Sequence, residues 1–372
     1  MRVGIIGGGV IGLGIGWRLA QAGCAVTLFE RDRAGSGASH AAAGMLAAGI
    51  ETEPGERDLF TLNHQSQALW PDFAADVQAA SGLDIGYRTE GTLRIALTRD
   101  DAAKLRHELA FQQSMGVALE WLTPAQARER EPYLDAKLAG AVFSPADHQV
   151  DNRKLAPALA AAFSKAGGVL REGQKIERIE IEAGRARALR TASGLHEFDV
   201  IVLAAGAWSG LIEGFPPLPV RPVKGQMLAL QMNPAAPLAH HVIWAPGVYI
   251  VPRADGRLVI GATVEERGFD GALTAGGLLA LLDGAWRALP GIEELPVIET
   301  WAGFRPGSRD DAPILGASGI DGLIFATGHH RNGILLTPVT VAAVTETILS
   351  GVSDPRILAF SMTRFQKRQQ AA

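Results

Sequence analysis

Residues 1–32, "MRVGIIGGGVIGLGIGWRLAQAGCAVTLFERD", decide the fold of this chain. They first suggest an export signal, because Arg2 precedes an apolar run from Val3 to Trp17. A membrane span is excluded, since Arg18 arrives before the roughly 20 apolar residues that a span requires. The glycines argue against a signal helix as well, because each costs about 1 kcal/mol in a helix interior. A strand, a turn and a helix explain the segment better.

Three of these glycines match the G-x-G-x-x-G pattern of a dinucleotide-binding turn. Residues 3–6 are typical of a buried parallel strand, and a helix is predicted over residues 10–22. In this arrangement Gly7 makes the tight turn, Gly9 lets the backbone approach a pyrophosphate, and Gly12 lets the helix pack on the strand. The N-terminal N–H groups of the helix then face the phosphates.

A second strand is predicted over residues 25–29, "AVTLF", and it ends at Glu30. An acidic residue at the end of this strand is suited to accept hydrogen bonds from ribose hydroxyl groups. The order strand, helix, strand and acidic residue therefore indicates a bound dinucleotide and not an export signal.

The composition excludes several classes of protein. A chain of 372 residues is long enough for two or three domains, and its 20% charged and 47% hydrophobic residues are ordinary for a globular protein. The net charge of −4, without a long basic run, argues against nucleic acid as the main partner. Cys24 is the only cysteine, which excludes an intramolecular disulfide and fits a reducing cytoplasm. No other stretch approaches membrane-spanning length, so we expect a cytoplasmic protein with no membrane partner.

Three further stretches of small residues suit a backbone that lies against a flat ligand. Residues 31–49, "RDRAGSGASHAAAGMLAAG", follow the ribose-binding strand directly, although a flexible linker has the same composition. Residues 198–210, "FDVIVLAAGAWSG", are a buried strand that runs into small residues, and residues 328–338, "GHHRNGILLTP", are a glycine loop before a closing helix. Residues 220–298 are mostly strands. The nucleotide-binding parts thus lie at the start, middle and end of the chain, with an antiparallel region inserted between them.

The chain carries, in this order, the motifs "GGGVIG…FE", "ASHAAAGML", "LAAGAWSG", "PVKGQ", "YIVPR…GRLVIGAT", "WAGFRPGSRDDAPILG" and "GHHRNGILLTP". As a set they resemble the D-amino-acid oxidase superfamily of flavoproteins, and most closely its glycine oxidase branch, over essentially the whole chain. The resemblance implies non-covalent FAD, oxidation of small amino acids to imino acids by hydride transfer to flavin, and reduction of oxygen to hydrogen peroxide. In the glycine oxidase branch the product feeds the thiazole of thiamine.

The resemblance also implies an α/β fold: a Rossmann-like FAD-binding domain with an inserted α+β substrate domain built on a largely antiparallel sheet. We assign residues 1–85, 141–217 and 300–372 to the FAD-binding domain, and residues 86–140 and 218–299 to the substrate-binding domain. The positions expected to contact FAD are Gly7, Gly9, Val10, Ile11, Gly12, Glu30, Arg31, Ala38, Ser39, Ala43, Gly44, Met45, Ile176, Ala205, Gly206, His329, His330, Arg331, Asn332, Gly333, Ile334 and Leu335.

Oxidation of an amino acid by hydride transfer requires above all that its α carbon be held against the flavin. The fixed handle of the substrate is its carboxylate, which a guanidinium binds at two points. Arg305 follows an apolar strand and precedes Pro-Gly, read as a turn, so we predict that it points into a cavity; a structural salt bridge is the alternative. Tyr249 lies in an alternating strand and is a second candidate donor to the carboxylate, with ordinary sheet packing as its alternative. The resemblance places Arg331 near the substrate.

Backbone N–H groups of residues 332–335 are expected to stabilise negative charge on the reduced flavin. His329 and His330 invite a metal site, but neighbouring histidines rarely share a metal and no acidic or thiol partner lies at metal spacing, so no metal is predicted. No residue stands out as a general base. None is needed if the substrate amine binds neutral, because its lone pair then drives hydride departure.

Several alternatives stay open. His330 and Val264 differ from what relatives often carry, so glycine, sarcosine and larger D-amino acids are all candidate substrates. An amino-acid dehydrogenase of the same fold that reduces a quinone is a competing function, although no amphipathic basic segment supports membrane association. A flavin-binding protein without turnover is another, against which the three candidate catalytic residues argue. Flavin attached through a cysteine in the C-terminal half is excluded, because Cys24 is the only thiol. A homo-oligomer is left open.

Overall fold

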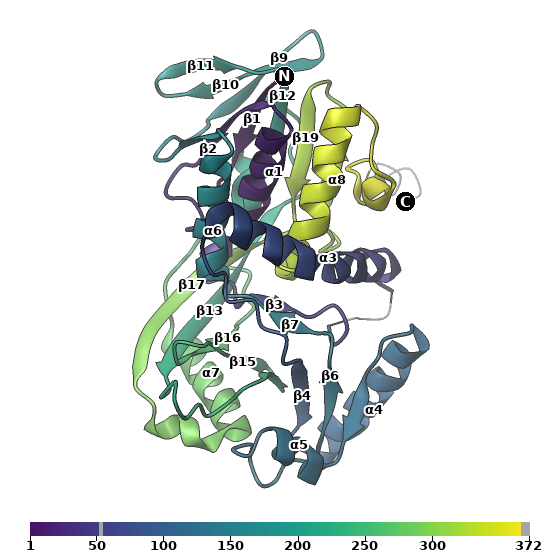
Figure 1. Ribbon diagram of the computed structural model, residues 1–372, viewed down its shortest axis with the longest axis vertical. Coiled ribbons are helices and arrows are strands. Elements are labelled where there is room, and N and C mark those ends of the chain that lie inside the picture. The colour runs from purple at the N-terminus through teal and green to yellow at the C-terminus, as the bar shows by residue number, and fades with distance from the viewer. Residues whose placement is uncertain (52–54, 366–372) are drawn as a thin grey trace.

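The computed structural model describes residues 1–51 and 55–365 and is built around two large β-sheets, one in each half of the molecule (Figure 1). The first sheet has six strands, and its neighbouring strands are parallel except for the edge strand β18, which is antiparallel to β19. In order across the sheet they are β18 (Ile314–Ala317), β19 (Leu323–Thr327), β12 (Val200–Leu203), β1 (Arg2–Ile6), β2 (Ala25–Phe29) and β8 (Val169–Arg171).

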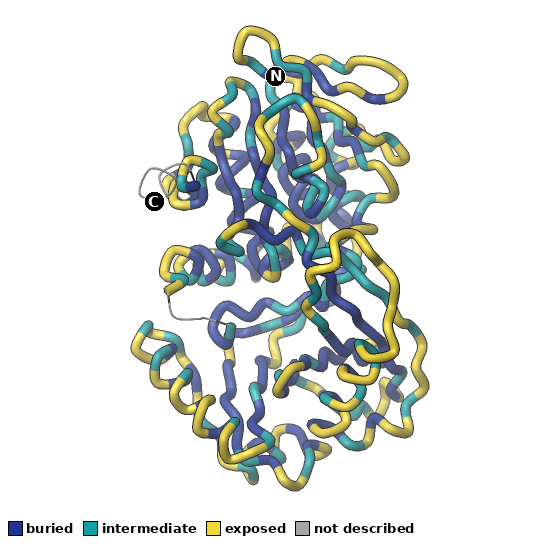
Figure 2. Tube along the Cα trace, turned by 180° about the vertical axis from the view of Figure 1, so that it is seen from behind, coloured by how far each residue is buried: buried dark blue, intermediate teal, exposed yellow. Residues whose placement is uncertain are grey.

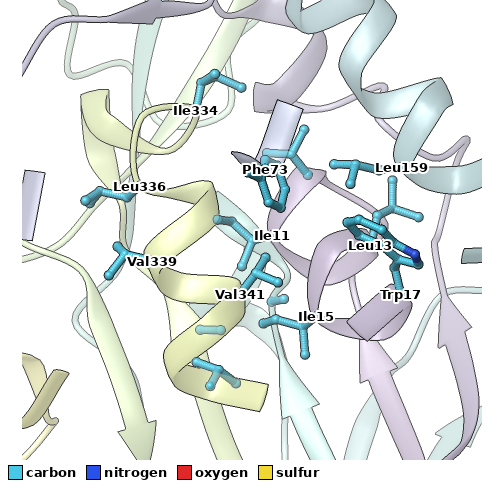
Figure 3. Close-up of a cluster of buried hydrophobic side chains, with 14 of the residues drawn as sticks. Ile11, Leu13, Ile15, Trp17, Phe73, Leu159, Ile334, Leu336, Val339 and Val341 are labelled. Carbon is cyan, nitrogen blue, oxygen red and sulfur yellow. The ribbon is translucent and has the colours of Figure 1, made fainter. Parts of the chain in front are cut away.

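Helices α1 (Val10–Gln21), α3 (Arg57–Ser81), α6 (Asn152–Lys165) and α8 (Thr337–Ser350) pack together beside this sheet. Their seam is apolar, and Figure 3 shows its side chains, among them Ile11 of α1 and Val341 of α8. Burying each such side chain stabilises the fold by about 1.5–3 kcal/mol. The close approach of α1 and α8 depends on Gly14, because a Cβ there would lie 2.5 Å from Cγ2 of Val341. The strand, helix and strand predicted from residues 3–29 are thereby confirmed as β1, α1 and β2.

The second sheet has eight strands and is antiparallel except where β4 pairs with β14. In order they are β17 (Val297–Gly307), β13 (Arg221–Gln231), β16 (Arg257–Gly261), β15 (Val248–Pro252), β14 (Val242–Ala245), β4 (Thr92–Ala96), β6 (Gly140–Ser144) and β5 (Glu120–Leu122). Helix α7 (Ala275–Ala288) packs on β13, β15 and β16, and α4 (Arg99–Ser114) and α5 (Pro124–Arg130) pack near β4–β6. The inward-facing aliphatic residues of these strands form a second buried core.

Smaller elements complete the described chain. Strands β9 (Arg178–Glu182), β10 (Arg185–Thr191) and β11 (Gly194–Glu197) form an antiparallel sheet at the end of the molecule that also carries the N-terminus (Figure 1). Strands β3 (Met45–Leu46) and β7 (His148–Gln149) pair where the two halves meet, and α2 (Ala38–Ala41) contacts β17 and α6. The 3₁₀ segments are η1 (Gly206–Leu211), η2 (Pro290–Glu294), η3 (His330–Asn332) and η4 (Pro355–Phe360). Figure 2 shows that buried chain runs through the strands of both halves, whereas exposed chain lies mostly in loops and on outer helices.

Two strands cross the domain limits expected from the sequence. Strand β6 pairs with β4 and β5 in the eight-stranded sheet, although residues from 141 onward are assigned to the FAD-binding domain. Strand β17 is one continuous strand through residue 300, because its hydrogen bonds to β13 run from Val297 to Gly307. The division into two domains otherwise stays a prediction. None of the helices in the described ranges combines the length and apolar character needed to cross a bilayer.

Candidate active site

A cavity of about 980 Å³ lies where the two halves meet, and residues of both sheets line it. Arg305, Tyr249, Val264 and all but one of the positions expected to contact FAD are among the lining residues. The exception is Gly12, for which a Cβ would lie 2.0 Å from the carbonyl oxygen of Gly7. Gly12 therefore acts behind the surface of the cavity, where it permits the turn to close on the helix.

The nucleotide end of the cavity is built from backbone. Gly7 has a φ of 106°, which favours glycine, and a Cβ there would lie 2.4 Å from the carbonyl oxygen of Ala204. The N-cap of α1 is Gly9, which offers no side-chain cap, and the N–H of Val10 donates to Oγ of Ser39 over 3.1 Å. A helix N-terminus with no acidic residue in its first turn favours a bound anion. This cradle fits a pyrophosphate.

Glu30 stands beside the cradle at the end of β2. One carboxylate oxygen accepts a hydrogen bond from the N–H of Gly8 at 2.8 Å, and the other accepts one from the N–H of Asp32 at 2.9 Å. These bonds hold the carboxylate at the cavity wall, where it fits the ribose hydroxyl groups. Nearby, the guanidinium of Arg31 lies over the ring of Trp208 at 3.7 Å, and both residues line the cavity.

The loop from His329 to Leu335 follows β19 and lines the cavity. His329 is buried, contacts Oγ1 of Thr340 through Nε2 at 3.2 Å, and has its pKa lowered to about 3 by burial. Of the expected N–H donors, that of Asn332 donates to the carbonyl of His329 at 2.9 Å, which leaves those of residues 333–335 as the candidates for the flavin. Within the described ranges, no three His, Cys, Asp or Glu side chains come together as a metal site.

Arg305 lies inside β17, so Pro306 and Gly307 end this strand and do not form the turn expected from the sequence. The sheet accepts the proline because β17 is an edge strand. The guanidinium donates to the carbonyl of Thr263 at 3.1 Å and of Lys224 at 3.4 Å, and no carboxylate of the described residues pairs with it. A cation at a cavity wall that has no carboxylate partner among the described residues is suited to receive an anionic ligand.

Tyr249 lies on β15, close to Arg305 of β17. Its hydroxyl group lies within hydrogen-bonding reach of the Arg305 guanidinium and donates to Sδ of Met227 at 3.3 Å. Burial raises the pKa of the phenol, and the Arg305 charge opposes this rise, so the hydroxyl keeps its proton and stays a donor. Gly225 makes room for the Arg305 guanidinium, since a Cβ there would lie 2.6 Å from its Nη1.

Arg331, the third candidate, lies opposite two carboxylates. Its Nε is 3.2 Å from Oε2 of Glu51, and its Nη2 is 3.2 Å from Oε2 of Glu56. Its charge is thus compensated by carboxylates, whereas no carboxylate of the described residues pairs with Arg305. Arg305 is therefore the stronger candidate for the substrate carboxylate.

Sequence reasoning missed Glu51, which lines the cavity. Burial raises the pKa of this carboxyl to about 7, against the lowering effect of Arg331. The sequence did contain a sign of its place at the cavity, because Glu51 is the first acidic residue after the run of small residues that ends at residue 49. His330 at the same end has its pKa lowered to about 4, chiefly by burial, so its ring is neutral near pH 7.

Comparison with known proteins agrees with this geometry. The family model described as FAD dependent oxidoreductase matches residues 2–347. The chain belongs to this family. FAD is accordingly its cofactor, and the backbone cradle, Glu30 and the small-residue loops described above are the parts of the cavity that fit it.

Individual relatives are similar over the whole chain. A glycine oxidase from Geobacillus kaustophilus is 39% identical over 368 residues, which cover 97% of this chain and 96% of the relative. A crystal structure of glycine oxidase from Geobacillus kaustophilus superposes with a TM-score of 0.92 at 38% identity, covering 98% of this chain and 99% of that one. A bifunctional protein ThiO/ThiG from Trichormus variabilis is 38% identical over 368 residues, 98% of this chain, but the match spans only 55% of that protein.

Proposed function

We propose that this protein oxidises glycine, or a comparably small amino acid such as sarcosine or a D-amino acid, with FAD as the immediate hydride acceptor and oxygen as the final one. The amino acid becomes an imino acid, which water hydrolyses to glyoxylate and ammonia in the case of glycine, and oxygen becomes hydrogen peroxide. The observation that carries the proposal is the Arg305 guanidinium, which faces the FAD cavity beside Tyr249 without a carboxylate partner among the described residues.

In this proposal the chain's own residues act mainly by positioning. Arg305 binds the substrate carboxylate at two points, and the Tyr249 hydroxyl donates a further hydrogen bond to it. The bound FAD supplies the acceptor for the hydride. Fixing the carboxylate orients the α carbon, and orientation of this kind supplies up to about 7–11 kcal/mol of the barrier. The neutral ring of His330 and the side chain of Val264 also line the cavity.

The named relatives support glycine as the first substrate to test, because the glycine oxidase of Geobacillus kaustophilus matches this chain from end to end in both sequence and structure. The likeness to a ThiO/ThiG protein supports a role in making the thiazole of thiamine, although this chain corresponds to about half of that protein. The single thiol, Cys24, supports a cytoplasmic location.

The test is a peroxide assay in air with purified holoprotein. Glycine, sarcosine, D-alanine and D-proline are compared under identical conditions, with catalase as the control for peroxide. Peroxide from at least one of them supports the proposal, and their relative kcat/KM values identify the substrate. Reduction of the flavin by an amino acid without peroxide release in air points instead to the quinone-linked dehydrogenase. No flavin reduction by any amino acid overturns the proposal.

A further inference from the structure

Glu51 places a carboxylate at the substrate end of the cavity. Its side chain is only 14% exposed and contacts Arg331, and its charge also acts on Arg305 and Tyr249. The other acidic residues that line the cavity lie elsewhere: Glu30 and Asp32 at the nucleotide end, Asp101 and Glu108 on α4. Among the described residues that line the cavity, Glu51 is thus the carboxylate whose charge interacts with both Arg305 and Tyr249.

The backbone that carries Glu51 is held in place. The N–H groups of Gly49 and Ile50 donate to the two carboxylate oxygens of Asp147 at 2.9 and 2.8 Å. The carbonyl of Ile50 accepts a hydrogen bond from Arg94 at 3.2 Å, and that of Glu51 accepts one from Arg331 at 3.4 Å. These hydrogen bonds hold the backbone of residues 49–51, which carries the Glu51 side chain at the cavity wall.

The proposed reaction needs a group of this kind. An amino acid at neutral pH carries an ammonium group, which has no lone pair to support departure of a hydride from the neighbouring carbon. An aliphatic ammonium has a pKa of about 10.4 in water, so at pH 7 only on the order of one molecule in a thousand is neutral. A base with a pKa near the working pH removes this limit most efficiently.

The charges that face Glu51 come from four directions. Arg331 of η3, Arg305 of β17 and Arg94 of β4 favour its ionised form, whereas burial and the carboxylate of Asp147 oppose it. The balance leaves the pKa of Glu51 at about 7, so the carboxyl exchanges a proton readily near neutral pH. A zwitterionic amino acid adds no net charge to this balance.

We propose that Glu51 is the proton acceptor for the ammonium group of the substrate, an inference that rests on the function proposed above. One N–H bond of the ammonium breaks, an O–H bond forms on the Glu51 carboxylate, and the lone pair left on nitrogen supports hydride departure from the α carbon. The proton returns to solvent after the product leaves. Glu56 also pairs with Arg331, but it is not among the residues that line the cavity.

The first test compares Glu51→Gln with Glu56→Gln. Both changes remove a carboxylate from Arg331, but Glu51 lines the cavity and Glu56 is not among the residues that do. In the wild type, kcat/KM for glycine should rise with pH to a plateau above about pH 7, the pKa of Glu51. In Glu51→Gln the rise of kcat/KM with pH should instead be centred near the pKa of the substrate amine. At pH 7 kcat/KM should therefore fall about 10²- to 10³-fold, and near pH 10 it should recover towards the wild-type value. Glu56→Gln should keep the wild-type profile.

The second test uses no turnover. Glycolate carries the carboxylate of glycine but no amine, so its binding adds a negative charge beside Glu51 and favours the protonated carboxyl. Its Kd, followed through the visible absorbance of the bound flavin, should weaken about tenfold per pH unit above pH 7 in the wild type and in Glu56→Gln. In Glu51→Gln it should be independent of pH over the same range. Calorimetry of the wild type in two buffers of different ionisation enthalpy should show proton uptake on binding.

The outcomes separate the two proposals. An unchanged acid limb in Glu51→Gln, or a loss of activity that is equal at all pH values, overturns the role of Glu51 while glycine oxidation stands. If Glu51→Gln does not retain FAD, glycolate binding to the wild type decides, and binding without proton uptake then overturns the inference. Absence of flavin reduction by any amino acid removes the proposed function itself.

Discussion

The two ends of the cavity are built by different means. At the nucleotide end the contacts come from backbone: a glycine turn, a helix N-terminus and loops of small residues between β1 and α2. At the substrate end they come from side chains, with Arg305 on β17, Tyr249 on β15, Arg331 on η3 and Glu51 after β3. The nucleotide end should therefore be most sensitive to added bulk at its glycines, and the substrate end to the loss of a functional group. This difference makes the two ends separable by mutation.

The largest effect is expected at Arg305. In Arg305→Ala the substrate carboxylate has no cationic partner in a partly desolvated site, and loss of one partner of such a pair costs about 2–5 kcal/mol, or roughly 30- to several thousand-fold in kcat/KM. Arg305→Lys keeps the charge but loses the planar two-point contact, so we expect a loss of about 10- to 100-fold. Steady-state kinetics with glycine measure both.

FAD content and melting temperature should stay near the wild-type values in both Arg305 variants, because the guanidinium forms no ion pair with a carboxylate of the described residues. If Arg305→Ala instead loses FAD while its remaining kcat/KM is normal, Arg305 is structural. The carboxylate would then have to bind at Arg331, and the contrast between the two ends would fail.

At the nucleotide end, adding a single methyl group at Gly7 should weaken FAD binding. In Gly7→Ala the positive φ costs about 1–3 kcal/mol, and the new Cβ meets the carbonyl of Ala204 at 2.4 Å. We expect FAD affinity to fall about 10- to 100-fold, measured by reconstitution of the apoprotein. Gly23→Ala is the matched control, since Gly23 also has a positive φ of 84° but open space around its Cβ position. It should lower stability by about 1 kcal/mol and leave the Kd for FAD unchanged; equal FAD loss in both variants would mean that strain alone is responsible.

Glu30 is a side chain at the backbone end, and its removal should weaken FAD binding about as much as Gly7→Ala does. Glu30→Ala removes the carboxylate that accepts from Gly8 and faces the expected ribose position. We expect FAD binding to weaken by roughly 1.5–3 kcal/mol, the value of a hydrogen bond to a charged group. An unchanged Kd for FAD in titration of the apoprotein would remove Glu30 from the binding site.

The smallest effect concerns pH and His329. Burial lowers the pKa of its folded form to about 3, below the value of about 6.5 for an exposed histidine, so the unfolded chain binds more protons between these pH values. Stability from this group is therefore complete above about pH 6.5 and declines as the pH falls towards 3. The glutamine of His329→Gln can still bond to Thr340. Between about pH 6.5 and pH 4 the melting temperature of this variant should fall by a few degrees less than that of the wild type. Parallel curves for the wild type and the variant would show that His329 does not titrate on unfolding.

Much of the nucleotide end was predictable from the sequence because its determinants are local. The turn at Gly7, helix α1 and strand β2 follow one another within 29 residues, and each is specified by neighbours along the chain. The residues around Arg305 show the limit of such reasoning. Pro306 and Gly307 have the composition of a turn, but pairing with β13 extends β17 through both of them. Only the place of β17 at the edge of the sheet explains why proline is accepted there.

The sequence by itself determined the turn, helix and strand order of residues 1–30, the three loops of small residues and the identity of Arg305 and Tyr249 as candidates. The tertiary structure alone decided that Glu51 and Glu56 compensate Arg331, that no carboxylate of the described residues pairs with Arg305, and that Glu51 lines the cavity. The reason is physical. Backbone conformation depends on neighbours a few residues away, whereas the ionisation of a buried carboxyl depends on desolvation and on charges that only folding brings together, as it does for Arg331 and Glu51.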